Sequence, residues 1–158
     1  MESTRAAPPD RVFPALEIRL HDLWCLLPVK DIREVVFVPW HQPLLEGPVW
    51  VKGLFRYGRD SVPLVDLGMR LLGTPTELDP GHLVVIVEAP HLFGLLVHQL
   101  REVVEVDPAC MAAPPAGFRS APYLTGSVAG QGADSFPLLS VPELSREFLE
   151  PELLPELE

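Results

Sequence analysis

Cysteine is scarce in this chain, which contains only Cys25 and Cys110 among its 158 residues. Two cysteines so far apart in the sequence cannot supply a disulfide framework or a Cys-x-x-Cys metal site. Cys25 lies inside an apolar run, so we predict that it is a small residue of the core. Cys110 is predicted to be a partly exposed thiol.

Positive charge is also in short supply, with 12 Lys and Arg against 22 Asp and Glu and a formal net charge of −10. Binding to nucleic acid or to anionic lipid needs clustered positive charge, so neither is an expected partner. No apolar run approaches the ~18 residues of a membrane span, and the start of the chain lacks an apolar signal core. We therefore expect a cytoplasmic protein without direct membrane insertion.

The motifs of common enzymes are missing as well. There is no glycine-rich phosphate loop and no Gly-x-Ser-x-Gly elbow. The histidines do not have the spacing of metal ligands on one helix. They are His21, His41, His82, His91 and His98. We expect no catalytic residues, no metal and no cofactor, although a small enzyme or a ligand-binding β-barrel remains an alternative of another class.

The chain does contain a repeat, in which three segments return in the same order. The pairs are 32–38 with 100–106, 50–53 with 123–126, and 60–67 with 134–141. A unit of about 70 residues that occurs twice indicates two similar small units, because a solenoid needs at least ~3 copies. Each half would be marginally stable alone, so we expect the two units to share one core.

Strand patterns dominate both units, and 19 prolines suit many short strands and edges. The predicted strands cover 16–20, 23–27, 32–38, 83–87, 92–97, 100–106, 126–128 and 136–139. Gly94 marks a bend or a close approach within its strand. Glycine-containing turns at 57–60 and 130–134 predict hairpins.

Each unit is predicted to end in a short helix. Asp66 is placed as an N-cap before residues 67–72, with Gly73 as the glycine after the helix. Ser140 occupies the matching place, and Glu143 three residues later completes a capping box that opens a helix through about Phe148. Residues 1–11 are predicted to be disordered, 12–148 to form the folded body and 149–158 to be an acidic tail.

These motifs, in this order, resemble the CheW-like domain family, the coupling proteins of bacterial chemosensory arrays. The matching segments are 51–53, 62–67, 94–97, 114–115 and 123–126, and the resemblance covers residues 13–148. It implies an all-β fold with short helices, in which two SH3-like five-stranded β-barrels pack on a shared core. It also implies a non-enzymatic adaptor that joins a histidine kinase regulatory domain to the cytoplasmic tip of a chemoreceptor.

The chain departs from the family pattern at two places. Arg56, Tyr57, Gly58 and Arg59 stand where the family has Asn-apolar-Arg-Gly, and His98 stands where aspartate is usual. We interpret these differences as those of a divergent paralogue. The alternative function is binding of kinase-type regulatory domains in a motility, type IV pilus or orphan system without receptor coupling.

The candidate partner-binding residues are Arg56, Tyr57, Gly58, Arg59, Trp40 and His98. Trp40 lies in a proline-flanked segment without strand alternation. Two interpretations are open: the ring folds over the seam of the barrels, or it anchors a partner, since tryptophan is enriched at binding hot spots. Trp50, which has Tyr123 as its repeat partner, is predicted to lie in the core.

Overall fold

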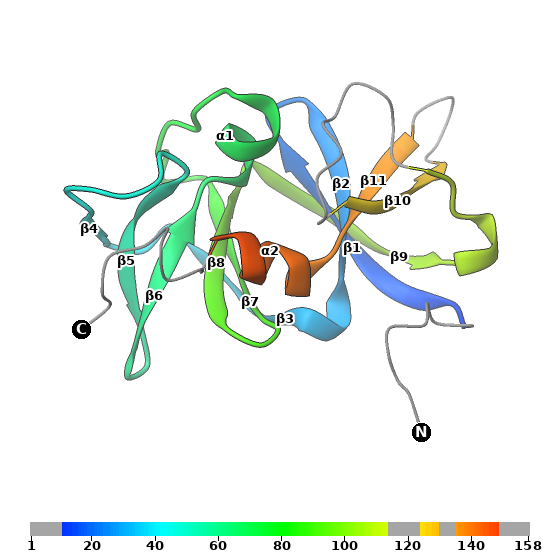
Figure 1. Ribbon diagram of the computed structural model, residues 1–158, viewed down its shortest axis with the longest axis horizontal. Helices are drawn as coiled ribbons and strands as arrows, with labels where there is room; N and C mark the ends of the chain where they lie inside the picture. Colours follow the sequence, from blue (N-terminus) through cyan, green and yellow to red (C-terminus); the bar gives the residue numbers. More distant parts are fainter. Residues whose placement is uncertain (1–10, 114–123, 130–134, 149–158) are drawn as a thin grey trace.

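The computed structural model describes residues 11–113, 124–129 and 135–148 (Figure 1). The strands are β1 Phe13–Leu20, β2 Leu23–Pro28, β3 Ile32–Phe37, β4 Gln42–Pro43, β5 Val51–Tyr57, β6 Asp60–Val65, β7 Leu83–Glu88, β8 Leu92–Val97, β9 Gln99–Val106, β10 Leu124–Ala129 and β11 Ser135–Leu139. The helices are α1 Leu67–Leu72 and α2 Val141–Phe148, with 3-10 turns η1 Val29–Asp31 and η2 Pro108–Cys110. The fold is therefore mostly β, as predicted.

The strands form two sheets with the same internal order. Sheet A has five strands in the order β10-β11-β2-β1-β9, and sheet B has six in the order β3-β7-β8-β6-β5-β4. In each sheet a C-terminal hairpin joins the rest through one parallel contact, β11 with β2 and β6 with β8. The edge strands β3 and β9 occupy equivalent places, which confirms that 32–38 and 100–106 are repeats.

The two units exchange their first hairpins. Hairpin β1–β2 begins the chain but lies in sheet A with β9, β10 and β11, and hairpin β7–β8 begins the second repeat but lies in sheet B. Each sheet thus contains strands from both repeats. The two units cannot separate without breaking sheet hydrogen bonds, which is a stronger connection than the shared core that the sequence predicts.

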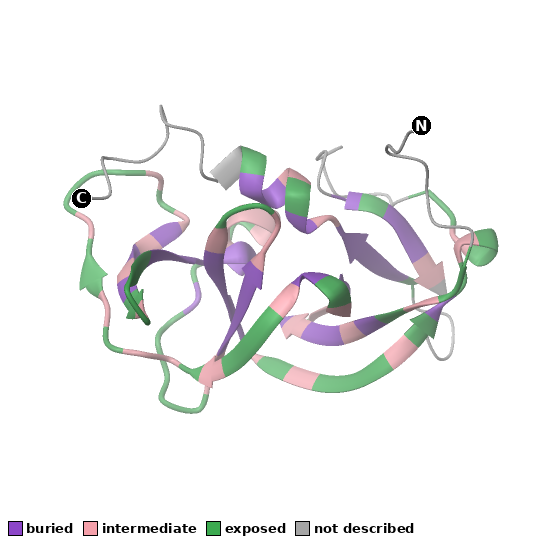
Figure 2. Ribbon diagram, turned by 90° about the horizontal axis from the view of Figure 1, so that it is seen from below, coloured by how far each residue is buried: buried purple, intermediate pink, exposed green. Residues whose placement is uncertain are grey.

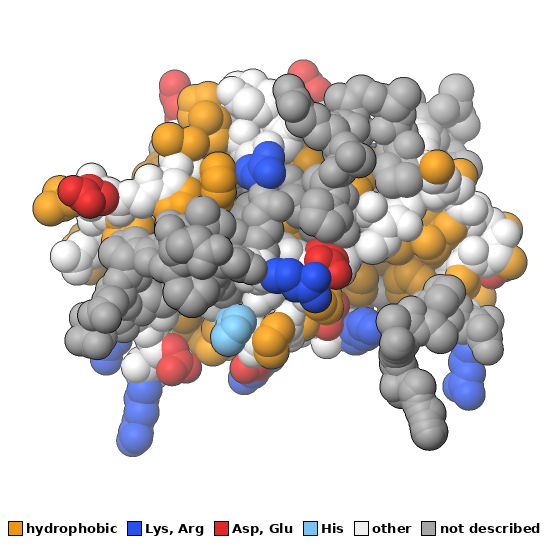
Figure 3. Space-filling model, viewed as in Figure 1, with side chains coloured by type: hydrophobic (Ala, Val, Ile, Leu, Met, Phe, Trp, Pro, Cys, Tyr) orange, Lys and Arg blue, Asp and Glu red, His pale blue; other side chains and the backbone are white. Residues whose placement is uncertain are grey.

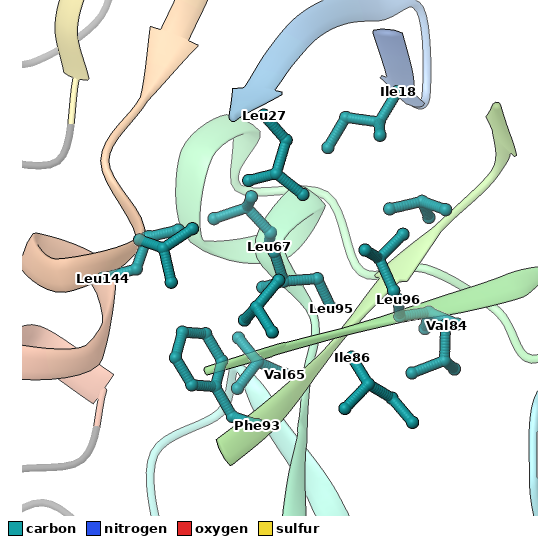
Figure 4. Packing of buried hydrophobic residues seen from close by; sticks show 14 of the residues in the cluster. Ile18, Leu27, Val65, Leu67, Val84, Ile86, Phe93, Leu95, Leu96 and Leu144 are labelled. Carbon is teal, nitrogen blue, oxygen red and sulfur yellow. The ribbon is translucent and has the colours of Figure 1, made fainter. Parts of the chain in front are cut away.

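One large hydrophobic core contains residues of both sheets, which confirms that the two units share a core. Ile18 and Leu27 of sheet A pack toward Leu67 of α1, Leu95 of β8 and Leu144 of α2 (Figure 4). A smaller cluster on the other face of sheet A contains Ala15, Leu26, Val106, Phe136 and Leu138. The strands β3 and β9 at the sheet edges are mostly exposed (Figure 2).

The predicted helix caps are also confirmed. Asp66 accepts a hydrogen bond from the Met69 N–H at 3.1 Å, and Gly73 follows α1 with φ of 73°. Ser140 Oγ accepts from the Glu143 N–H at 3.3 Å at the start of α2. Aspartate and serine side chains satisfy N–H groups that have no partner inside the helix, which is why each repeat ends in this way.

Other predictions have mixed outcomes. Cys25 is buried and Cys110 exposed, as expected, and Trp50 packs against the large core while remaining partly exposed. Segment 38–43, predicted to lack strand structure, contains the two-residue strand β4. The barrels are open sheets, one of them with six strands. The expected disordered start, acidic tail, Pro114–Pro115, Tyr123 and the 130–134 turn lie outside the described residues.

Candidate partner-binding surface

The tip of hairpin β5–β6 carries four of the six candidate residues. Arg56 and Tyr57 end β5, and Gly58 and Arg59 form the turn that leads into β6. Gly58 has φ of 64°, in the left-handed region that favours glycine. Lys and Arg side chains project from this end of the hairpin on a protein of net charge −10 (Figure 3). The tip therefore presents two exposed arginines, with the acidic residues Asp60 and Glu34 beside them.

Tyr57 ties the hairpin tip to strand β3. Its phenolic O–H donates to the Glu34 carboxylate at 2.7 Å, although β5 and β3 are separated by three strands in sheet B. The sheet must therefore curl until its two sides approach, as in a barrel. This hydrogen bond to Glu34 raises the pKa of Tyr57, because ionised tyrosine would face a carboxylate.

Residues 37–49, which run from the last residue of β3 toward β5, expose several large apolar side chains. We refer to them as the apolar loop. The exposed fractions are 70% for Phe37, 79% for Trp40, 101% for Leu45 and 72% for Val49. Hydrophobic side chains gather at the end of the molecule that carries β4 (Figure 3). The interpretation of Trp40 as a ring folded over a seam is wrong, because so exposed a ring covers little of its own protein.

Gly53 holds the apolar loop against the sheet. A Cβ atom at this position would lie 2.4 Å from the carbonyl oxygen of Gln42, so only glycine lets β4 approach β5. The second repeat has the same arrangement, since a Cβ on Gly126 would lie 3.1 Å from the Ala112 carbonyl oxygen. Ala112 and Ser127 form a β-bridge there. The repeated glycine thus positions a loop across each sheet.

His98 does not belong to this surface. The parallel register of Leu64 with Gly94 places the hairpin tip level with the start of β8, whereas His98 follows the end of β8. Its side chain is partly buried, and its Nδ1 accepts a hydrogen bond from the backbone N–H of His21 at 2.9 Å. His98, where the chain departs from the family pattern, therefore makes contacts within the protein and is not part of the candidate partner-binding surface.

Sequence reasoning missed Phe37, Leu45 and Val49. The sequence did contain a signal for their exposure: three prolines fall within residues 39–48, and apolar and polar residues do not alternate there. An apolar segment that is neither a regular strand nor a regular helix has no regular face to bury. Isolated exposed apolar residues are common, but four on one loop form a patch of the kind that marks interaction sites.

The chemistry available at this surface is binding. Among the residues described, no group of three or more His, Cys, Asp or Glu side chains could hold a metal ion. The surface offers an exposed tryptophan and exposed arginines, residue types that are enriched at protein–protein hot spots.

Comparison with known proteins decides the family. The family model of the CheW-like domain matches residues 14–148, most of the chain. The chain belongs to the CheW-like domain family. The crystal structure of the scaffolding protein TtCheW from Thermoanaerobacter tengcongensis is similar to it, with a TM-score of 0.73 and 20% identity over 82% of this chain and 90% of that chain. No curated protein matches the chain.

The CheW-like assignment places this chain in a family of adaptors of chemosensory signalling. The repeat order, the paired caps and the paired loop-positioning glycines are thus features of a CheW-like domain. In the described part of the chain, neither helix is long and apolar enough to cross a membrane.

Proposed function

We propose that this CheW-like domain is a cytoplasmic adaptor that couples a histidine kinase regulatory domain to chemoreceptors. The kinase regulatory domain docks on the apolar loop, and the charged tip of hairpin β5–β6 borders the contact. The receptor tip is held between the two units. The protein contributes geometry to the assembly and carries out no reaction of its own.

The observation that carries this proposal is the exposure of Trp40 on a loop of defined position. Trp40 is 79% exposed, and the neighbouring β4 pairs with β5 at Gly53, where only glycine leaves room for it. A tryptophan side chain offers a large contact area and has few rotatable bonds to fix on binding, which favours affinity. Removing such an anchor typically weakens binding by 2 kcal/mol or more, about 30-fold in Kd.

The test is a calorimetric titration of the purified chain against kinase regulatory domains from the same genome. We expect one of them to bind, and W40A to weaken that binding at least about 30-fold while its melting temperature stays within about 1 °C of wild type. The matched control is L78A, which trims another exposed apolar side chain outside the apolar loop. Equal effects of the two variants, or no binding to any kinase, would contradict the proposal.

One observation favours the second candidate, a paralogue that binds the kinase without coupling receptors. Gly58 has a left-handed conformation, which disfavours an arginine at that position by about 1 kcal/mol. The turn of this chain therefore differs in backbone preference, as well as in side chain, from a turn with the arginine of the family pattern. The positive charge at Arg59 projects from a different point of the hairpin. Binding to kinase but never to receptor tips would select this candidate.

A further inference from the structure

Three histidines from distant parts of the chain meet where the two sheets adjoin; we call them the histidine cluster. His21 lies in the turn between β1 and β2, His82 immediately precedes β7, and His98 connects β8 to β9. The ring of His98 lies 4.4 Å from that of His21 and 4.7 Å from that of His82, centroid to centroid. The cluster thus brings together the β1–β2 turn of sheet A, the start of β7 in sheet B and the residue that links β8 of sheet B to β9 of sheet A.

The hydrogen bonds of His98 define its protonation state. The backbone N–H of His21 donates to Nδ1 of His98 at 2.9 Å, so Nδ1 must offer a lone pair and the neutral ring carries its proton on Nε2. The backbone N–H of His98 in turn donates to the carbonyl of Arg19 at 2.9 Å. Beside these bonds β1 pairs with β9, and Arg19 Nε donates to Gln99 Oε1 at 3.0 Å. The bond from His21 to His98 is the one of these that exists only while His98 is neutral.

His21 is held in a conformation that non-glycine residues rarely adopt, with φ of 56°. Its carbonyl accepts from the Arg19 guanidinium, and its Nε2 lies 2.8 Å from the carbonyl oxygen of Thr74, in the segment after α1. A left-handed residue persists when surrounding contacts hold it there. The bond to His98 is one of the contacts that hold the β1–β2 turn.

We propose that the histidine cluster is an acid-labile latch on the β1–β2 turn. A proton taken from solvent onto Nδ1 of His98 turns that atom into a donor facing the donor N–H of His21, so the hydrogen bond breaks and the β1–β2 turn is released. The new N–H bond is the only covalent change, and deprotonation restores the contact. The latch does not depend on which partner the protein binds.

The surroundings of His98 favour its neutral form. Burial is the largest cause that lowers its pKa, followed by His21, His82 and Arg19, while Asp66 acts in the opposite direction. The Asp66 carboxylate is already occupied by Thr76 and by Lys52, whose Nζ lies 3.6 Å away. Since the folded pKa lies below the unfolded value of about 6.5, the stability due to neutral His98 is complete above that pH and is lost as the pH falls.

A metal site is the competing interpretation of three adjacent imidazoles, and the hydrogen bonding opposes it. With its Nδ1 lone pair engaged and its Nε2 protonated, His98 has no free lone pair to offer a cation. The cluster in this geometry is therefore suited to respond to protons.

The test compares melting temperatures of wild type, H98N and H91N from pH 8 to pH 5. The asparagine amide oxygen can accept the bond from His21 at every pH, and His91 is an exposed histidine outside the cluster. Below pH 6.5 we expect wild type to lose up to about 3–5 °C per pH unit relative to H98N, while H91N follows wild type. Parallel curves for wild type and H98N would overturn the proposal.

A measurement on wild type alone covers the case in which H98N does not fold. Long-range proton–nitrogen correlation spectra report which ring nitrogen of His98 carries the proton. We expect an unprotonated Nδ1 at pH 7.5, and the backbone amide signal of His21 to shift with the titration of His98. A protonated Nδ1 at neutral pH, or a His21 amide that ignores the titration, would overturn the latch.

Discussion

The two helix caps offer a comparison inside one molecule, since Asp66 and Ser140 hold equivalent positions in the repeats. Asp66 is 1% exposed and accepts three hydrogen bonds. These come from the Met69 N–H at 3.1 Å, the Thr76 N–H at 2.8 Å and the Thr76 hydroxyl at 2.7 Å. Ser140 accepts one bond, at 3.3 Å, from a partly exposed position.

Substitution by alanine should therefore have very different costs at the two caps. D66A removes a cap, worth about 1 kcal/mol, and leaves both donors of buried Thr76 without acceptors, at about 1–3 kcal/mol each. We expect D66A to destabilise the protein by about 3–7 kcal/mol, or roughly 9–21 °C in Tm. S140A should cost only about 0.5–1 kcal/mol.

Urea unfolding of wild type, D66A, D66N and S140A measures these differences. D66N keeps one acceptor oxygen and should fall between wild type and D66A, since its amide group faces a donor. A D66A variant as stable as S140A would refute the reasoning, because it would mean that the buried Thr76 donors find other acceptors.

The remaining predictions concern packing, thiol reactivity and the hairpin. G94A should destabilise by about 1–3 kcal/mol in thermal melts, because the new Cβ would lie 2.7 Å from Val84 Cγ1; an unchanged Tm would contradict this. A thiol reagent should label Cys110 in the native protein and reach Cys25 only after unfolding, since burial raises the Cys25 pKa and excludes the reagent; rapid native labelling of both would contradict this. Reversing both hairpin arginines, Arg56→Glu with Arg59→Glu, should slow association with an acidic partner and reduce its salt dependence; identical on-rates in stopped flow would assign the charges to solvent.

Local features of the fold could be predicted from the sequence because their causes are local. Alternating and continuous apolar runs located the strands, and the cap residues located both helices. The glycine of the β5–β6 turn was likewise identified from its neighbours. The repeat itself predicted two equivalent units with a common core, which the identical strand orders of the two sheets confirm.

The features that depend on long-range partners could not be predicted. A strand pattern does not say which other strand it pairs with, so the exchange of hairpins β1–β2 and β7–β8 was not foreseen. His21, His82 and His98 meet only because that exchange brings three segment ends together, and no spacing along the chain indicates it. The exposed apolar loop was foreseen only at Trp40.

The central claim, that this CheW-like domain couples a kinase to a receptor, is tested most directly by co-sedimentation. Receptor cytoplasmic fragments assembled on vesicles are mixed with the histidine kinase, with and without the purified chain. We expect the kinase to sediment with the receptors only when the chain is present, and W40A to reduce the sedimented kinase severalfold. Kinase that binds the chain in solution but never sediments with receptors would contradict coupling.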